Sequence, residues 1–152
     1  MLLRPPLKMN IGVEVNFVVQ DSIKALALYE SIFEVRRVEV TEYPRGNNEA
    51  VFTIYGTRFH VLDENPQFML IAPKLGDPNP IWFNVIVPDI KKSYQKAMSV
   101  GCTEIQPPTV MKEMSLTNAM FSDPFGYIGM LHQIHREVNF EERCKIMGDK
   151  LK

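Results

Sequence analysis

A short internal repeat constrains the fold of this chain more than any other feature. The segments 16–21 (NFVVQD) and 84–89 (NVIVPD) match with a shift of 68 residues. In each copy a β-branched run leads to an aspartate, which is typical of a strand followed by a capped helix. About three further strand-like segments follow each helical segment. The repeat therefore predicts the order β-α-β-β-β twice, as expected after a gene duplication.

The first copy shows clear strand and helix patterns. Residues 11–19 alternate polar and apolar side chains, which predicts a half-buried strand that includes Glu14. Asp21 or Ser22 is a suitable N-cap for a helix over residues 23–33. Further strands are expected over residues 35–43, 50–55 and 58–62, and turns at Pro44–Asn48 and Gly56 separate them.

The second copy repeats this order. A strand is expected over residues 81–87, then Asp89 as the N-cap of a helix over 90–100 that ends at Gly101. A short strand over 103–106 should stop before two prolines, and a hairpin loop should separate the last two strands. The two prolines are Pro107-Pro108. The hairpin loop is Asp123–Gly126, between the strands 116–121 and 127–134.

The repeat also predicts the domain organisation. Each copy has one helix to cover one face of a curved sheet, so the other face must be buried by the second copy. We expect an α+β fold, in which two βαβββ modules form a curved, trough-like mixed sheet with the helices outside. Residues 1–152 form one domain, after a loose lead-in at Pro5-Pro6. Its expected parts are module one (about 11–64), a Pro-rich linker (about 65–80), module two (about 81–135) and a C-terminal helix (about 139–148) opened by Asn139 and Glu142.

Composition excludes several classes of function. The 17 Lys+Arg against 18 Asp+Glu residues give no basic excess, so no nucleic-acid partner is expected. The apolar runs are too short to span a bilayer, and the start of the chain lacks the apolar stretch of a signal peptide. Two cysteines form neither a disulfide framework nor a zinc cage. A cytoplasmic protein without a membrane partner is the expectation.

Four segments carry a more specific pattern: residues 21–33 (DSIKALALYESIF), 61–68 (VLDENPQF), 97–101 leading to two prolines, and 121–127 (FSDPFGY). The last, with DPFG between two strands, is the most specific. On these segments the chain resembles the glyoxalase/bleomycin-resistance/dioxygenase superfamily, also called vicinal oxygen chelate, over roughly residues 11–142. The NPQF segment and the tail helix are most similar to its PhnB-like branch. Glu34 departs from the pattern, because a glycine commonly follows the first helix.

The resemblance implies a trough-shaped site and, in the metal-dependent members, four His or Glu ligands from four strands. Carried over, these positions are Glu14, His60, Trp82 and Met130. Tryptophan does not coordinate a divalent ion, and a thioether suits soft copper. His132 lies two residues beyond Met130 and would become a third ligand after a register shift of two. We therefore expect no cofactor, with Glu14, His60 and His132 as weak candidates for a divalent metal.

Several candidate side chains have two readings. Glu14 and His60 are either an acid/base pair in the trough or solvated wall residues. Trp82 either stacks on a planar ligand or fills the trough. Asn16 and Asn84 either hydrogen-bond across the module seam or bind the ligand. Arg58 is either a clamp for an anion or a solvated residue at a strand end, and His132 is either a ligand-binding or an exposed residue. Met130 is expected in an adaptable wall of the trough, and Tyr29 in the core. His135 is expected at the surface, and Cys102 is expected to be an unactivated thiol.

Four functions remain open on the sequence. The first is a metal-free protein that binds a small, largely neutral molecule, as antibiotic-sequestering members do. The second is a metal-dependent lyase, isomerase or dioxygenase-like enzyme, and the third is a metal-free acid/base enzyme that uses Glu14 and His60. The fourth is a binding module without a small ligand. Phosphate-binding loops and a nucleophile elbow are absent from the sequence. A closed homodimer is expected in each case.

Overall fold

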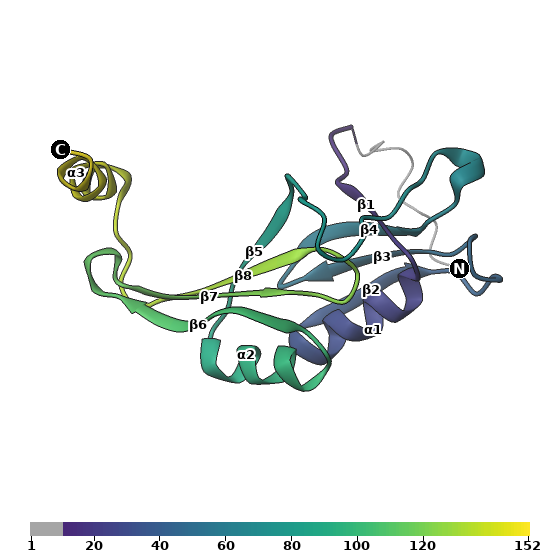
Figure 1. Cartoon of the computed structure of the whole chain (residues 1–152), viewed down its shortest axis with the longest axis horizontal. Helices are drawn as coiled ribbons and strands as arrows, with labels where there is room; N and C mark the ends of the chain where they lie inside the picture. Colours follow the sequence, from purple (N-terminus) through teal and green to yellow (C-terminus); the bar gives the residue numbers. More distant parts are fainter. Residues whose placement is uncertain (1–10) are drawn as a thin grey trace.

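The computed structural model describes residues 11–152, so the expected lead-in at Pro5-Pro6 lies outside the described residues. Module one forms a four-stranded mixed sheet with one helix (Figure 1). Its strand order is β1-β4-β3-β2, in which β1 is parallel to β4 and the other pairs are antiparallel. The elements are β1 (Asn16–Val19), α1 (Ser22–Ile32), β2 (Val35–Val40), β3 (Glu49–Ile54) and β4 (Thr57–Asp63).

Module two has the same topology. Its strand order β5-β8-β7-β6 again combines one parallel pair with two antiparallel pairs. The elements are β5 (Trp82–Ile86), α2 (Ile90–Ser99), β6 (Thr103–Met111), β7 (Leu116–Ser122) and β8 (Ile128–Ile134). A single-turn helix, η1 (Pro66–Phe68), lies in the segment between the modules. The predicted α+β fold of two βαβββ modules is therefore confirmed.

The two modules begin their helices in the same way. The Asp21 carboxylate accepts a hydrogen bond from the Lys24 amide at 3.1 Å, and Asp89 accepts one from the Lys92 amide at 3.1 Å. Both aspartates are N-caps, because they satisfy an amide that has no partner within the helix. The repeat thus marks the point where each strand passes into its helix.

The core lies at the seam between the modules. In Figure 1 the sheets lie side by side with α1 and α2 on the same side, and the two helices are in contact. Phe17 of β1 packs on Phe83 of β5 with ring centroids 5.0 Å apart, and on Tyr127 at 5.4 Å. Two hydrogen bonds join the modules, one from the Tyr127 hydroxyl to the Val18 carbonyl and one from the Tyr29 hydroxyl to the Asp123 carboxylate, both at 2.9 Å. The core position expected for Tyr29 is confirmed.

Two strands differ from the sequence expectation. The first strand begins at Asn16, so Glu14 precedes β1 instead of lying on it. Strand β6 does not stop before Pro107-Pro108 but continues to Met111, with register shifts between Glu104, Gln106 and Thr109. Because β6 is an edge strand, a proline there need not interrupt a ladder on both sides. The bulges absorb both prolines.

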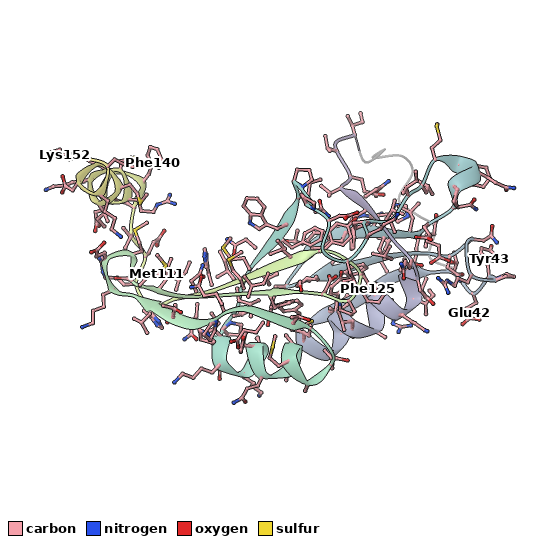
Figure 2. All side chains as sticks on the ribbon, viewed as in Figure 1. Glu42, Tyr43, Met111, Phe125, Phe140 and Lys152 are labelled. Carbon is pink, nitrogen blue, oxygen red and sulfur yellow. The ribbon has the colours of Figure 1, made fainter. Side chains whose placement is uncertain are left out.

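The C-terminal helix α3 (Phe140–Lys150) extends away from both modules (Figure 1). Asn139 caps it by accepting a hydrogen bond from the Glu142 amide at 2.8 Å, as expected. The helix touches the single-turn helix η2 (Lys112–Met114), and Lys150 pairs with Glu113 at 2.8 Å. Figure 2 shows Phe140 on this distant helix, where its ring is exposed. Within residues 11–152 no helix is long and apolar enough to cross a membrane.

Candidate functional site

Each sheet has one face toward the helices and one open face. Along β4 the side chains of Phe59, Val61 and Asp63 face the helix, so by strand alternation Arg58 and His60 belong to the open face. In the same way Leu131 of β8 is buried in the core, and its neighbours Met130 and His132 lie on the open face. The candidate site residues therefore belong to the open faces of the two sheets.

Glu14 and His60 meet at the open face of module one. The Glu14 Oε1 atom lies 2.6 Å from His60 Nδ1, and Glu14 Oε2 accepts a hydrogen bond from Arg58 at 3.3 Å. The hydrogen bond from His60 is the largest effect and lowers the pKa of Glu14 below its usual value, although desolvation opposes it; the charges of His60 and Arg58 lower the pKa further. The predicted acid/base pair is in contact, with Arg58 beside it.

The second nitrogen of His60 has an unusual environment. His60 Nε2 is buried and, within the described residues, has no hydrogen-bond partner. The nearest carboxylate oxygen, Glu49 Oε2, is 3.6 Å away, which is too long for a good hydrogen bond. Glu49 was not predicted from the sequence. The signal that could have found it is strand alternation, because Ala50 and Phe52 face the core and Glu49 must face the other way.

The open face of module two carries amides in place of carboxylates. His132 Nδ1 lies 3.3 Å from the Asn84 amide nitrogen, and His132 Nε2 lies 2.8 Å from the Asn118 amide nitrogen. Burial lowers the pKa of His132, which favours the neutral imidazole. Asn118 was also missed by the sequence analysis, although it lies directly opposite His132 in the β7–β8 register.

Two apolar side chains extend the module-two face. Trp82 and Ile86 of β5 are 52% and 56% exposed, on the same side as Asn84. In the β5–β8 register, Asn84 pairs with Met130, just as Asn16 pairs with His60 in module one. The repeat shift of 68 likewise makes Trp82 the counterpart of Glu14. Where module one has a carboxylate and an imidazole, module two has an indole and a thioether.

The structure forms two groups from the predicted residues. Glu14, Arg58 and His60 form one group, and Asn84 and His132 form the other. Among residues 11–152, no direct hydrogen bond or ion pair joins the groups. Asn16 is exposed and Asn84 contacts His132, so the expected hydrogen bond between the two asparagines across the seam is not formed.

The donors of the described residues do not fit a divalent metal site of the four-strand type. Glu14 and Glu49 lie beside different nitrogens of His60, so one ion could not bind the imidazole and both carboxylates. His132 lies between two amide nitrogens, which are not metal ligands. Within residues 11–152 no three His, Cys, Asp or Glu side chains converge in a way that could hold an ion. No step of the chemistry below depends on a metal.

Two other residues lie apart from these groups. Cys102 is buried, and burial with a smaller effect of Asp123 raises its pKa to about 12. A thiol with this pKa is protonated at neutral pH and is a poor nucleophile. His135 is exposed, as expected, and contacts the Thr117 hydroxyl at 2.7 Å.

Comparison with known proteins identifies the fold. No protein-family model matches the sequence, and no curated protein is similar to it. Among solved structures, the fosfomycin resistance protein FosX from Listeria monocytogenes, complexed with Mn(II) and sulfate, is similar with a TM-score of 0.64 and 16% identity over 91% of this chain and 99% of that chain. TioX from Micromonospora sp. ML1 is similar with a TM-score of 0.57 and 14% identity over 84% and 99% of the two chains.

A third solved structure carries the family description itself. A glyoxalase/bleomycin resistance protein/dioxygenase family enzyme from Burkholderia phytofirmans PsJN is similar with a TM-score of 0.62 and 16% identity, over 80% of this chain and 96% of that chain. At these identities the similarity concerns the fold, and the PhnB-like branch stays a prediction. The chain therefore shares the fold of these three proteins, one of which is a glyoxalase/bleomycin resistance protein/dioxygenase family enzyme, and this is the fold that the resemblance implied.

Proposed function

We propose that this protein binds a small, planar and largely uncharged molecule without a resident metal ion. One observation carries the proposal. The positions occupied by Glu14 and His60 in module one are occupied by Trp82 and Met130 in module two. An exposed indole offers a flat surface for stacking, and a thioether adapts to different ligand shapes. The neutral imidazole and amides around His132 supply hydrogen bonds without charge.

Binding can be measured through the protein itself, because Trp82 is the only tryptophan. Caffeine, which is small, planar and uncharged, and fosfomycin, a small anion, are suitable probes, each titrated in EDTA and in Mn(II) while the indole fluorescence is followed. We expect saturable quenching by caffeine in EDTA and no response to fosfomycin. Met130→Ala should weaken the binding of caffeine about tenfold, and Met147→Ala on the distant helix α3 should leave it unchanged. Binding that requires Mn(II), or a melting temperature that rises with Mn(II) alone, would instead support the metal-dependent lyase, isomerase or dioxygenase-like enzyme.

We further propose that the protein is a homodimer. Phe140 of helix α3 is exposed, and so are Leu151, which follows this helix, and Ile86 of β5. An apolar surface of this kind is commonly covered in an assembly, and a two-fold dimer is the commonest closed one. Light scattering behind a sizing column should give twice the monomer mass. A monomer at micromolar concentration would contradict the dimer and would leave the ligand proposal to its own test.

A cytoplasmic location is part of the same proposal. Cys102 and Cys144 are both free thiols, and Cys144 is exposed. An exposed unpaired thiol is compatible with a reducing compartment. Fractionation of cells that produce the protein would test this location.

A second candidate function is a metal-free enzyme that moves a proton on a small carbonyl compound. The observation in its favour is the pair formed by Glu14 and His60, in which the carboxylate holds Nδ1 while Nε2 has no hydrogen-bond partner among residues 11–152. This is the arrangement expected of an oriented general base. Exchange of deuterium from D₂O into dihydroxyacetone, followed by NMR, tests it. The exchange rate should fall at least tenfold in Glu14→Gln and stay unchanged in Glu137→Gln, whereas no exchange above background would exclude this activity on that substrate.

A further inference from the structure

A cavity of about 150 Å³ lies at the seam between the modules, and of the polar groups on the open faces only Asn84 lines it. Its walls are mainly side chains that turn toward the core of each module. They include Phe17, Phe52 and Phe59 from module one, and Phe83, Val85 and Phe121 from module two. Trp82 and Asn84 line part of the same cavity at the edge strand β5. The cavity therefore lies beneath the edge of β5, whereas Met130 and His132 are not among its lining residues.

The aromatic walls hold one another in place. Phe59 meets Phe17 edge-on, with ring centroids 6.4 Å apart at 90°, and meets Phe83 edge-on at 5.6 Å and 86°. It also stacks on Phe52 at 5.9 Å. These are favourable geometries for aromatic pairs. The walls thus present both ring faces and ring edges without rearrangement.

The position of Phe121 depends on a glycine. A Cβ atom at Gly129 would lie 2.6 Å from Phe121 Cζ, closer than side chains tolerate. The backbone of Gly129 is in an ordinary conformation, since it is not among the positive-φ glycines. The glycine is therefore required by the close approach of the Phe121 ring, which forms one wall of the cavity.

The chemistry of the cavity selects against charge. The one buried carboxylate that reaches it, Asp123, already accepts hydrogen bonds from the Tyr29 hydroxyl and from the amides of Phe125 and Tyr127 at 2.9–3.0 Å. An ion in this cavity would lose its hydration without gaining a partner. By contrast, an apolar cavity of about this volume holds benzene or xenon in an engineered protein.

The outer part of the cavity is more polar. A neighbouring hollow shares Ile54, Phe59, Asn84 and Val85 with it, and adds Tyr55 and Thr57. Asn84 and Thr57 therefore place polar side chains at the rim, beside a ring that lies inside. This combination of an apolar interior with a few polar groups at the rim is typical of small-molecule sites.

We propose that the seam cavity is a second binding site, which takes one neutral aromatic ring with at most one hydroxyl or amine substituent. The seam cavity differs from the site proposed on the open faces, because its other walls are the aromatic core of the seam and the two sites share only Trp82 and Asn84. It also predicts an order of ligands. Phenol should bind best, benzene should follow, and benzoate, which has the same ring with a charge, should be excluded.

Titration of the labelled protein with phenol, benzene and benzoate tests the site. Methyl signals of Val85 and Ile54 should move saturably with phenol, with a Kd on the order of 1 mM. At ten times that Kd the melting temperature should rise by roughly 3–6 °C. Benzoate should cause neither change. Methyl signals that do not move with phenol or benzene, or that move equally with benzoate, would overturn the proposal.

Substitutions at the wall separate this site from the open faces. Val85→Phe fills the cavity and should weaken phenol binding at least tenfold, whereas Val110→Phe on the exposed part of β6 is the matched control and should not. Val85→Ala enlarges the cavity, so it should shift the preference from phenol toward the larger indole. If Val85→Phe does not fold, the change in size preference of Val85→Ala still decides. An unchanged preference in Val85→Ala, or unchanged affinity in a folded Val85→Phe, contradicts the proposal.

Discussion

Modules one and two share their topology and register but differ where a polar side chain meets the start of the helix. In module one the last residue of β4, Asp63, accepts the Ser22 amide at 2.7 Å, and in module two Gln133 of β8 accepts the Ile90 amide at 2.9 Å. Asp63 also accepts the Ser22 hydroxyl at 2.7 Å and the amides of Gly46 and Asn48 at 2.8 and 2.9 Å. One copy thus uses a charged residue with four donors, and the other uses a neutral residue at the same place.

The open faces differ in the same sense. Module one has a carboxylate and an imidazole where module two has an indole and a thioether. Both copies kept the capping aspartate and the alternation of buried residues, which define the backbone. The side chains on the open faces do not define the backbone in this way, so their residue types could diverge between the two copies. This comparison shows why the fold alone does not determine the function.

The largest expected effect is the loss of Asp63. Asp63→Ala leaves three amides and a hydroxyl without their acceptor at a site where the side chain is 2% exposed, so we expect a loss of about 3–5 kcal/mol in the free energy of unfolding. Gln133→Ala, its counterpart in module two, should cost about 1 kcal/mol. Urea unfolding of the two variants measures both losses. Equal losses would show that the charge of Asp63 has no special role.

The pH dependence of stability should separate two buried aspartates. Burial raises the pKa of Asp63, but its hydrogen bonds outweigh this and bring the pKa below the usual value. Since the unfolded chain then binds more protons, Asp63 contributes stability above the unfolded pKa of about 3.9, and this is lost as the pH falls through the folded pKa. For Asp123 burial is the larger effect and raises the pKa, despite hydrogen bonds from Tyr127 and Tyr29. Stability from Asp123 is therefore present below about pH 3.9 and is lost as the pH rises through its folded pKa.

Variants that remove each charge test these opposite signs. Urea midpoints would be measured from about pH 3 to pH 8. Asp63→Asn should remove a rise in stability with pH at the acid end. Asp123→Asn should remove a fall in stability with pH above about 3.9, because the amide side chain does not titrate. Its oxygen can still accept hydrogen bonds from the Tyr127 and Phe125 backbone amides, so these contacts are kept. If the two substitutions changed the slope of stability against pH in the same direction, relative to the unsubstituted protein, the prediction would be contradicted.

Smaller and equal effects are expected at the two helix caps. Asp21→Ala and Asp89→Ala each remove one hydrogen bond of 3.1 Å to the third residue beyond the cap. Each should cost about 1 kcal/mol, and the two costs should agree within about 0.5 kcal/mol. Thermal unfolding of both single variants and of the double variant measures this. A clear difference between them would show that the modules depend unequally on the feature that the repeat conserved.

Most of the fold could be predicted from the sequence, because the relevant signals are local. The capping aspartates, the alternation of apolar residues in the strands and the DPFG turn each depend on a few neighbouring residues. The extension of β6 through Pro107-Pro108 could not be predicted, because only its place at the sheet edge makes the prolines tolerable. The position of Glu14 before β1, and not on it, could not be predicted for a similar reason. Where β1 begins depends on how far β4 accompanies it.

The site was predicted less completely, because its contacts join residues far apart in the sequence. The resemblance named His60 and Met130, and strand alternation put His132 on the same side as Met130; all three residues belong to the open faces. Glu49 and Asn118 were missed, since their contacts with the two histidines depend on which strands are neighbours. The expected bond between Asn16 and Asn84 failed for the same reason. Equivalent positions in a repeat need not be close in space, and His132 was the nearer partner of Asn84.

The smallest expected effect concerns the charged group that distinguishes the face of module one. The pKa of Glu14 is lowered chiefly by its hydrogen bond with His60 and less by Arg58. His60→Ala should therefore raise the pKa of Glu14 toward its ordinary value, and Arg58→Ala should raise it by less. A carboxyl ¹³C NMR titration of the two variants gives the order directly. If Arg58→Ala raised the pKa as much as His60→Ala, the contact between Glu14 Oε1 and His60 Nδ1 would not hold the pair in solution. The acid/base candidate would then lose its orienting group, whereas the binding proposal, which depends on Trp82 and Met130, would stand.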